Sequence, residues 1–226
     1  MATLCCFAQR KNNNIKNNIQ TQEKTIKTKS SSKSSGFIGG HRYVDLGLPS
    51  GLKWATCNVG ATKPEEYGDY FAWGETKTKS SYTESNSATY GMDNSWLKSN
   101  GYIDSRGNLS KAHDAASANW GSTWRMPTKA EIDELVENTT TEWTTRNGVK
   151  GSLVKSERNG NSIFIPAAGY RGGTLLNYAG ENGYCWSSPP DESSANYAYS
   201  LGFYSGYFSR VWSNRGCGQS VRPVSE

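Results

Sequence analysis

The most regular hydrophobic pattern of the chain lies near its end, over residues 197–204. Large apolar or aromatic side chains occupy every second position there, and small or polar residues fill most positions between them. A period of two is typical of a β-strand with one buried face, because successive side chains point to opposite faces. We therefore expect one set to point inward (Tyr199, Leu201, Phe203) and the other to point outward (Ser200, Gly202, Tyr204).

Weaker patterns predict strands earlier in the chain. Residues 43–60 are predicted to form a hairpin around a Pro-Ser-Gly turn, and the aromatic run 67–75 a further short strand. A second hairpin is expected over 151–165, with an Asn-Gly turn. These turn residues separate strands because they adopt the backbone angles that tight turns need.

A long polar stretch, residues 76–107, follows the aromatic run. It is rich in Gly, Ser and Asn, with Trp96 and Tyr102 as the side chains expected to pin it. A loop of this length in a compact domain is either packed by its own side chains or functional. The composition of the segment Asp104–Asn108 predicts a turn. A calcium-binding loop is not expected there, because the segment carries too few carboxylates.

Two short helices are predicted in the middle of the chain. One covers about 114–120. The second begins after Thr128, since Glu131 three residues later completes a capping box, and it runs to about Glu137. Its spacing of apolar residues predicts one buried face (Ile132, Leu135, Val136).

The composition favours a loop-rich fold over a helical bundle. The chain has 226 residues, 35% of them hydrophobic, with 24 glycines and eight tryptophans. This length is enough for one domain with its own core. No apolar run approaches the roughly 20 residues of a membrane-spanning helix, so no membrane span is expected.

The positive charge of the chain is concentrated in its first part. The net charge is +5, but residues 1–40 carry seven basic side chains and one acidic side chain, so the remainder is at −1. Residues 10–35 are mostly Asn, Lys, Ser, Thr and Gln, a composition typical of a disordered tether. We therefore divide the chain into a segment 1–40 and a folded domain 41–226, and predict no nucleic-acid partner for that domain.

The first nine residues allow two interpretations. They are short and apolar, with small residues before Arg10, and resemble the last part of a secretory signal peptide that lacks its basic start. The alternative is an unstructured N-terminus. N-terminal sequencing of the protein from its native host distinguishes the two, since a chain that still begins at Met1 rules out processing.

The cysteines and histidines give no metal or cofactor site. There are five cysteines and two histidines, without a Cys-x-x-Cys pair. Cys57 lies in a strand pattern and is interpreted as a core residue. Cys185 and Cys217 form either a disulfide or two unrelated thiols, and the second interpretation is favoured.

No catalytic constellation is apparent. His113 lies beside Asp114, but no nucleophile motif accompanies them, so a structural role is favoured. The acidic residues of the helix near 131–137 are explained by a favourable charge at its N-terminus and by solvation. The sequence therefore predicts a protein that is not an enzyme.

The last third of the chain has the composition of a binding surface. Tyr, Ser, Gly and Asn dominate it, together with Trp and Arg. Tyrosine and tryptophan offer large rigid contact areas, and the small polar residues offer adaptable hydrogen bonds. Ordinary aromatic packing in a sheet remains the alternative. The residues expected to share one exposed, ligand-binding face are Asn177, Tyr184, Tyr197, Ser200, Gly202, Tyr204, Tyr207, Ser209, Arg210, Ser213, Asn214 and Cys217.

Several motifs resemble a known domain family. They include Val-Asp-Leu-Gly-Leu (44–48), Lys-Trp-Ala-Thr-Cys-Asn-Val-Gly-Ala (53–61), Gly-Asp-Tyr-Phe-Ala-Trp-Gly-Glu (68–75), Trp-Arg-Met-Pro-Thr (124–128) and Ile-Pro-Ala-Ala-Gly-Tyr-Arg (165–171). In this order they resemble the Fibrobacter succinogenes major paralogous domains of Bacteroidetes, over about residues 42–225. That resemblance implies an α+β, C-type-lectin-like fold, with short helices packed on small twisted antiparallel sheets.

The C-terminal part resembles a narrower group, the variable proteins of diversity-generating retroelements from gut Bacteroidetes or their phages. The similarity lies in Tyr184, Trp186–Ser188, Leu201, Phe203, Arg215 and Gly218–Val224. In that group an error-prone reverse transcriptase mutates adenines, so that Asn codons become codons for Tyr, Ser, Gly, Arg and Cys. The resemblance implies that residues of about 170–224 vary while the core stays constant.

The resemblance also implies a role. The chain is expected to be secreted, displayed on a cell surface or associated with a virion, and to bind a protein or glycan ligand on another cell, host or phage. The related formylglycine-generating enzymes need a closely spaced cysteine pair, whereas Cys185 and Cys217 are far apart in the sequence. Calcium-dependent sugar binding is not implied, because the Glu-Pro-Asn and Trp-Asn-Asp motifs are missing. The alternative role is a non-diversified structural or assembly domain of the cell envelope.

Overall fold

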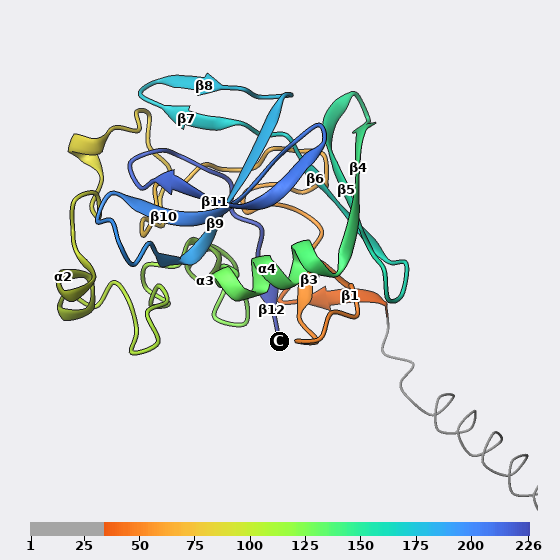
Figure 1. Cartoon of the computed structure of the whole chain (residues 1–226), viewed down its shortest axis with the longest axis horizontal. Helices are drawn as coiled ribbons and strands as arrows, with labels where there is room; N and C mark the ends of the chain where they lie inside the picture. Colours follow the sequence, from red (N-terminus) through yellow and green to blue (C-terminus); the bar gives the residue numbers. More distant parts are fainter. Residues whose placement is uncertain (1–33) are drawn as a thin grey trace, which may run out of the picture. The chain divides into compact units, whose positions relative to one another are not determined.

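Small antiparallel sheets connected by long loops make up most of the computed structural model, which describes residues 34–226 (Figure 1). The first sheet has the strand order β1-β2-β3-β12. Its strands are β1 (Ser35–Ile38), β2 (His41–Asp45), β3 (Lys53–Ala55) and β12 (Val224–Ser225). This sheet therefore joins the first and last described strands of the folded unit.

The second sheet is the one around which the candidate site is built. It has the order β11-β10-β9, with β9 (Asn182–Pro190), β10 (Tyr197–Tyr204) and β11 (Tyr207–Asn214). A third sheet contains β4 (Thr139–Arg146), β5 (Val149–Ser156) and β6 (Ser162–Pro166). A separate hairpin is formed by β7 (Tyr170–Gly172) and β8 (Leu175–Asn177), at the top of Figure 1.

The described helices are short. They are the 3₁₀ turn η1 (Glu84–Asn86), α2 (Asn94–Ser99), α3 (Ala115–Trp120) and α4 (Lys129–Glu137). The predicted capping box of α4 is confirmed: the Glu131 amide donates to the Thr128 hydroxyl, and the Thr128 amide donates to the Glu131 carboxylate. Asp114 caps α3 by accepting from the Ser117 amide at 2.9 Å. Both predicted helices are thus present.

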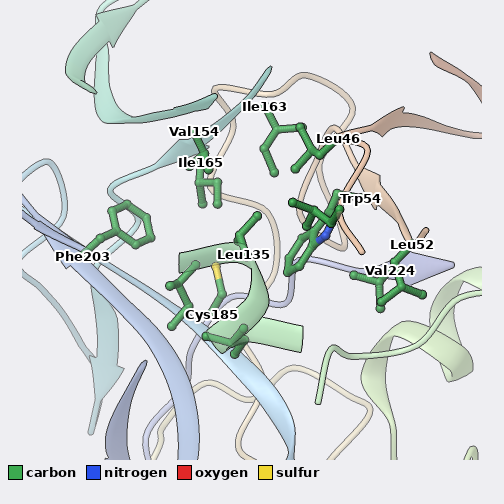
Figure 2. Packing of buried hydrophobic residues seen from close by; sticks show 13 residues of the cluster. Leu46, Leu52, Trp54, Leu135, Val154, Ile163, Ile165, Cys185, Phe203 and Val224 are labelled. Carbon is green, nitrogen blue, oxygen red and sulfur yellow. The ribbon is translucent and has the colours of Figure 1, made fainter. Parts of the chain in front are cut away.

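The core lies where α4 meets the sheets. Ile132 and Leu135 of α4 pack with side chains from the first three sheets. Figure 2 shows Leu135 among residues of all three, such as Trp54, Ile165 and Cys185. A second cluster surrounds Trp73 and Trp186. α4 contacts β11, β10 and β9, so it supports one face of the second sheet. The coarse α+β, loop-rich class is confirmed.

The start of the folded unit differs from the prediction. Residues 35–40, placed in the N-terminal segment from their composition, form β1 and its turn to β2. The carbonyl of Ile38 accepts from the Trp124 indole at 3.0 Å, and Gly39 and Gly40 adopt positive φ of 54° and 85° at the turn. The predictions for residues 1–9 and 10–33 lie outside the described residues.

The aromatic run 67–75 is not a strand, and that prediction was wrong. Phe71 forms a single bridge, to Gln219. The segment passes between two clusters, because Phe71 and Trp73 pack in one while Tyr70 and Ala72 pack in the other. The alternation of the sequence therefore reflects burial on both sides rather than a half-buried strand.

The remaining predictions of local structure agree with the structure in most places. The hairpin at 43–60 is β2–β3, the one at 151–165 is β5–β6, and Asp104 closes the expected turn by accepting from the Arg106 and Asn108 amides. Within 34–226 no helix is long and apolar enough to cross a membrane.

Candidate ligand-binding face

Strand register divides the side chains of the second sheet between two faces. Residues that are directly opposite in an antiparallel pair share a face. β10 pairs with β11 so that Gly202 is opposite Ser209, and Tyr204 is opposite Tyr207. On its other side, Gly202 is opposite Tyr184 of β9. These residues therefore share one face, and Tyr199, Leu201 and Phe203 share the other.

The second of these faces is part of the core. Tyr199, Leu201 and Phe203 are buried, as predicted, and the last two pack with Ile132 and Leu135 of α4. The ring of Phe203 lies against the backbone of Gly183, where an added Cβ would be 2.0 Å from the ring. Such close approach requires glycine at this position and fixes the spacing of β9 and β10.

The opposite face carries a group of tyrosines. The rings of Tyr204 and Tyr207 stack with centroids 4.8 Å apart, and both are exposed. Tyr184 continues the group, since its hydroxyl accepts from Asn182, which is opposite Tyr204. We call this surface the tyrosine face; it consists of Tyr170, Tyr178, Tyr184, Tyr204, Tyr207 and Ser209.

The β7–β8 hairpin supplies the other two tyrosines. The ring of Tyr170 in β7 meets that of Tyr184 edge-on at 5.8 Å, and that of Tyr178, after β8, at 6.1 Å. Asn177 is opposite Tyr170 in the hairpin, which places this predicted site residue at the margin of the face. The hairpin is held to the body because Arg171 exchanges both backbone hydrogen bonds with Gly218.

Cys217 lies at the same end of the face. Burial raises the pKa of Tyr170, and Cys217, Tyr178 and Tyr184 add to that rise, so these four groups are close together. Burial, followed by the charge of Glu84, also raises the pKa of Cys217. The thiol is therefore protonated at neutral pH and acts as a small polarisable contact rather than as a nucleophile.

Three residues expected on the exposed surface are buried, and that part of the prediction was wrong. Ser200, Gly202 and Ser213 are on the predicted side of the sheet but are covered. The hydroxyls of Ser200 and Ser213 hydrogen-bond each other at 2.7 Å, and the Val211 side chain lies over Gly202. These small residues form the floor of the face, while their larger neighbours reach solvent.

Three further residues do not belong to the tyrosine face. Tyr197 and Asn214 are opposite each other on the α4 side of the sheet, as is Arg210. The Arg210 guanidinium donates to Asp133 of α4 at 2.8 Å. Asn214 donates to Glu84 at 2.8 Å. The prediction placed all three on one surface, whereas strand twist and register separate them from Tyr204 and Tyr207.

The cysteines, His113 and Asp114 are the reactive or titratable groups that the sequence singled out, and each has a defined place in the structure. Cys57, Cys185 and Cys217 are free, so the possible Cys185–Cys217 disulfide is not formed. The ring of His113 stacks on Tyr102, and Asp114 caps α3. Within residues 34–226 no three His, Cys, Asp or Glu side chains are grouped in a way that would hold a metal ion. The tyrosine face presents aromatic rings and hydroxyl groups to solvent.

Sequence reasoning missed two members of the face, Tyr170 and Tyr178. The signal for them was the Tyr-rich composition of 162–226, but their position depends on the β7–β8 hairpin, which the sequence pattern did not predict. Comparison of the chain with protein-family models, with curated proteins and with solved structures gave no match.

Proposed function

We propose that this chain is a ligand-binding protein with a C-type-lectin-like fold, and that the tyrosine face contacts its ligand. We propose further that a diversity-generating retroelement mutates the codons of this face, so that different versions of the protein bind different protein or glycan ligands. The protein works at a cell surface, after secretion, or on a virion, and it forms and breaks no covalent bonds in its ligand.

One observation carries the proposal. Exposed tyrosines gather on one side of a sheet whose other side is core, and alternate residues of the same strand serve the two sides. Exposed aromatic patches mark recognition surfaces. Side chains on the tyrosine face can therefore change without altering the packing of Leu201 and Phe203. A rigid scaffold of this kind suits a surface that must tolerate substitution.

The arrangement also explains how the face would bind. Tyr204 and Tyr207 restrict each other through stacking, so little side-chain entropy is lost when a ligand covers them. Ser209 lies beside the stacked rings as a small polar residue, opposite Gly202, which the Val211 side chain covers. A ligand would meet a rigid aromatic ridge flanked by small polar positions.

The first test is to sequence the coding region of residues 170–224 in many cells of one population. We expect substitutions at Tyr184, Tyr204, Tyr207 and Ser209, in codons that derive from adenines, with Leu201 and Phe203 unchanged. An invariant region would contradict diversification and favour the structural envelope role.

The second test measures how well each face of the sheet tolerates substitution. A surface-display library randomised at Tyr184, Tyr204, Tyr207 and Ser209 should yield mostly folded proteins. A matched library randomised at Tyr199, Leu201 and Phe203 should not. Equal folded fractions in the two libraries would contradict the division between scaffold and binding face.

A further inference from the structure

A groove lies at the edge of the same sheet, on the side opposite to the tyrosine face. The groove has a volume of about 540 Å³ and is lined by Tyr197, Tyr199, Trp212 and the loop 191–194. Sequence reasoning placed only Tyr197 in a site, and on the other surface. We propose that this groove binds a saccharide ring, stacked on Trp212, without a metal ion.

Trp212 provides the stacking surface. Its side chain is 66% exposed, more than that of any other tryptophan among residues 34–226. The indole is nonetheless oriented, because its ring lies 6.3 Å from that of Tyr199, tilted by 43°, in the groove that Asp191 also lines. An aromatic ring held at its edge and open on its face matches the C–H face of a pyranose.

The loop provides fixed hydrogen-bonding groups. Asp191 is buried and accepts from the Ser193 amide at 2.9 Å and from the Ser193 hydroxyl at 2.6 Å. Burial alone would raise the pKa of Asp191, but the hydrogen bonds from Ser193 outweigh it, together with the nearby polar groups of Tyr199 and Trp212, and the pKa lies below its usual value. The carboxylate is therefore ionised and pre-positioned at neutral pH.

Glu192 forms the outer rim of the groove. It accepts from the Tyr199 hydroxyl at 2.5 Å and from the Lys129 ammonium. The side chain of Glu192 remains exposed, so its carboxylate has free lone pairs for ligand hydroxyls. Ser194 and Tyr197 line the same groove and add further residues with polar groups.

A buried arginine holds the loop in place. Arg215 donates to the carbonyls of Tyr197, Met92 and Thr89, at 2.9, 2.8 and 3.2 Å. These hydrogen bonds tie the chain around the groove to the long loop that contains α2. The site is therefore preorganised, which lowers the entropy that a ligand must overcome on binding.

The charges around the groove balance, and this selects the class of ligand. Three carboxylates are matched by three basic side chains: Asp133, Asp191 and Glu192 with Lys129, Arg210 and Arg215. No net field favours an anion or a cation. A neutral molecule with one apolar face and many hydroxyls fits both the open indole and the polar rim. A saccharide has these properties, whereas an aliphatic ligand would leave the rim unpaired.

This inference does not depend on the role of the tyrosine face, because the two sites use different residues and opposite sides of the sheet. The test uses the full chain in buffer with EDTA. Neutral mono- and oligosaccharides on a glycan array are screened first, and the best binder is titrated while the indole N–H signals of the eight tryptophans are recorded by NMR. We expect saturable binding and a shift of the Trp212 indole signal, assigned from Trp212→Phe.

Variants then locate the binding. Trp212→Ala should weaken saccharide binding at least tenfold, and Glu192→Gln should weaken it by a smaller factor. Phe37→Ala is the matched control, because Phe37 is 71% exposed and lies outside both sites, and Tyr204→Ala controls for the tyrosine face. Both controls should bind the saccharide as the wild type does.

Several outcomes would overturn the inference. They are the absence of any neutral saccharide binder in EDTA, equal binding by Trp212→Ala that is shown to be folded by circular dichroism, or a shift of tryptophan signals other than that of Trp212. Binding of tetramethylammonium at this site, without saccharide binding, would assign the groove to cationic groups instead. Loss of saccharide binding in Tyr204→Ala alone would place the sugar on the tyrosine face.

Discussion

The two faces of the β9–β10–β11 sheet use aromatic residues in opposite ways. Phe203 and Tyr204 are neighbours in the chain, yet the first is buried against α4 and Gly183 while the second stacks on Tyr207 in solvent. On the α4 side, Leu201 and Phe203 resist substitution because their side chains fill a shaped space. On the other side, the exposed Tyr204 and Tyr207 can accept it. One strand therefore carries both kinds of position.

The largest expected effect is at Phe203. Phe203→Ala should lower the free energy of unfolding by about 3–5 kcal/mol, because it removes a buried ring and leaves a cavity beside Leu135 and Leu201. Urea unfolding measures the change. Phe203→Leu is the control and should lose less than about 1.5 kcal/mol. A small effect of the alanine variant would mean that this face is not core.

Gly183 tests the same face from the opposite strand. Gly183→Ala should destabilise by about 1–3 kcal/mol, because the new methyl group overlaps the Phe203 ring. Thermal unfolding gives the measurement. Combining it with Phe203→Leu should recover part of the loss, since the smaller side chain makes room. Full additivity of the two changes would argue against direct contact.

Ser200 tests the buried floor of the tyrosine face. Ser200→Ala should lower the free energy of unfolding by about 1–2 kcal/mol, because the Ser213 hydroxyl loses its partner while it stays buried. The double variant Ser200→Ala/Ser213→Ala should be no less stable than the single one. If the single variant were as stable as the wild type, the floor would be open to water.

Ionisation of Tyr199 should make the free energy of unfolding depend on pH. Burial, followed by the hydrogen bond to Glu192, raises the pKa of Tyr199 to about 12. Because the unfolded pKa is about 10, the neutral phenol stabilises the fold below about pH 10, and this contribution is lost as the pH rises toward 12. The stability advantage of the wild type over Tyr199→Phe should therefore shrink by about 1 kcal/mol over this range. Urea unfolding at pH 9 and pH 11.5 tests this, and a constant difference would contradict it.

The smallest effect is expected on the exposed side. Tyr204→Ala and Tyr207→Ala should each change the free energy of unfolding by less than about 1 kcal/mol, since both side chains are exposed and contribute mainly to one stacking contact. A loss comparable to that of Phe203→Ala would mean that the tyrosine face is part of the core. Thermal unfolding beside the Phe203 variants provides the comparison.

Local signals were sufficient to predict some elements. α4 follows from Thr128 and Glu131, whose capping interactions lie within one turn, and the buried side of β10 follows from strict alternation. Both depend on neighbours in the sequence. β4 was missed although its threonines and Trp143 favour strands.

The burial of individual site residues could not be predicted in the same way. The side of the sheet on which Ser200 lies follows from alternation, but its burial follows from its contact with Ser213, which depends on the register of β11. The exposure of Trp212 likewise depends on where β11 crosses α4. These are properties of pairing between strands, and a one-residue change of register would reverse them.

The last strand of the first sheet, β12, determines what happens to chains that are truncated or shifted in reading frame. Arg222 donates to the carbonyl of Ala55, 167 positions earlier, and β12 pairs with β3 immediately afterwards. Both elements come after the residues of the tyrosine face in the order of synthesis. A stop codon or frameshift in the codons of that face removes both elements and leaves the first sheet open. Such a product should be degraded. Only chains translated in the correct frame through β12 would therefore accumulate as folded protein.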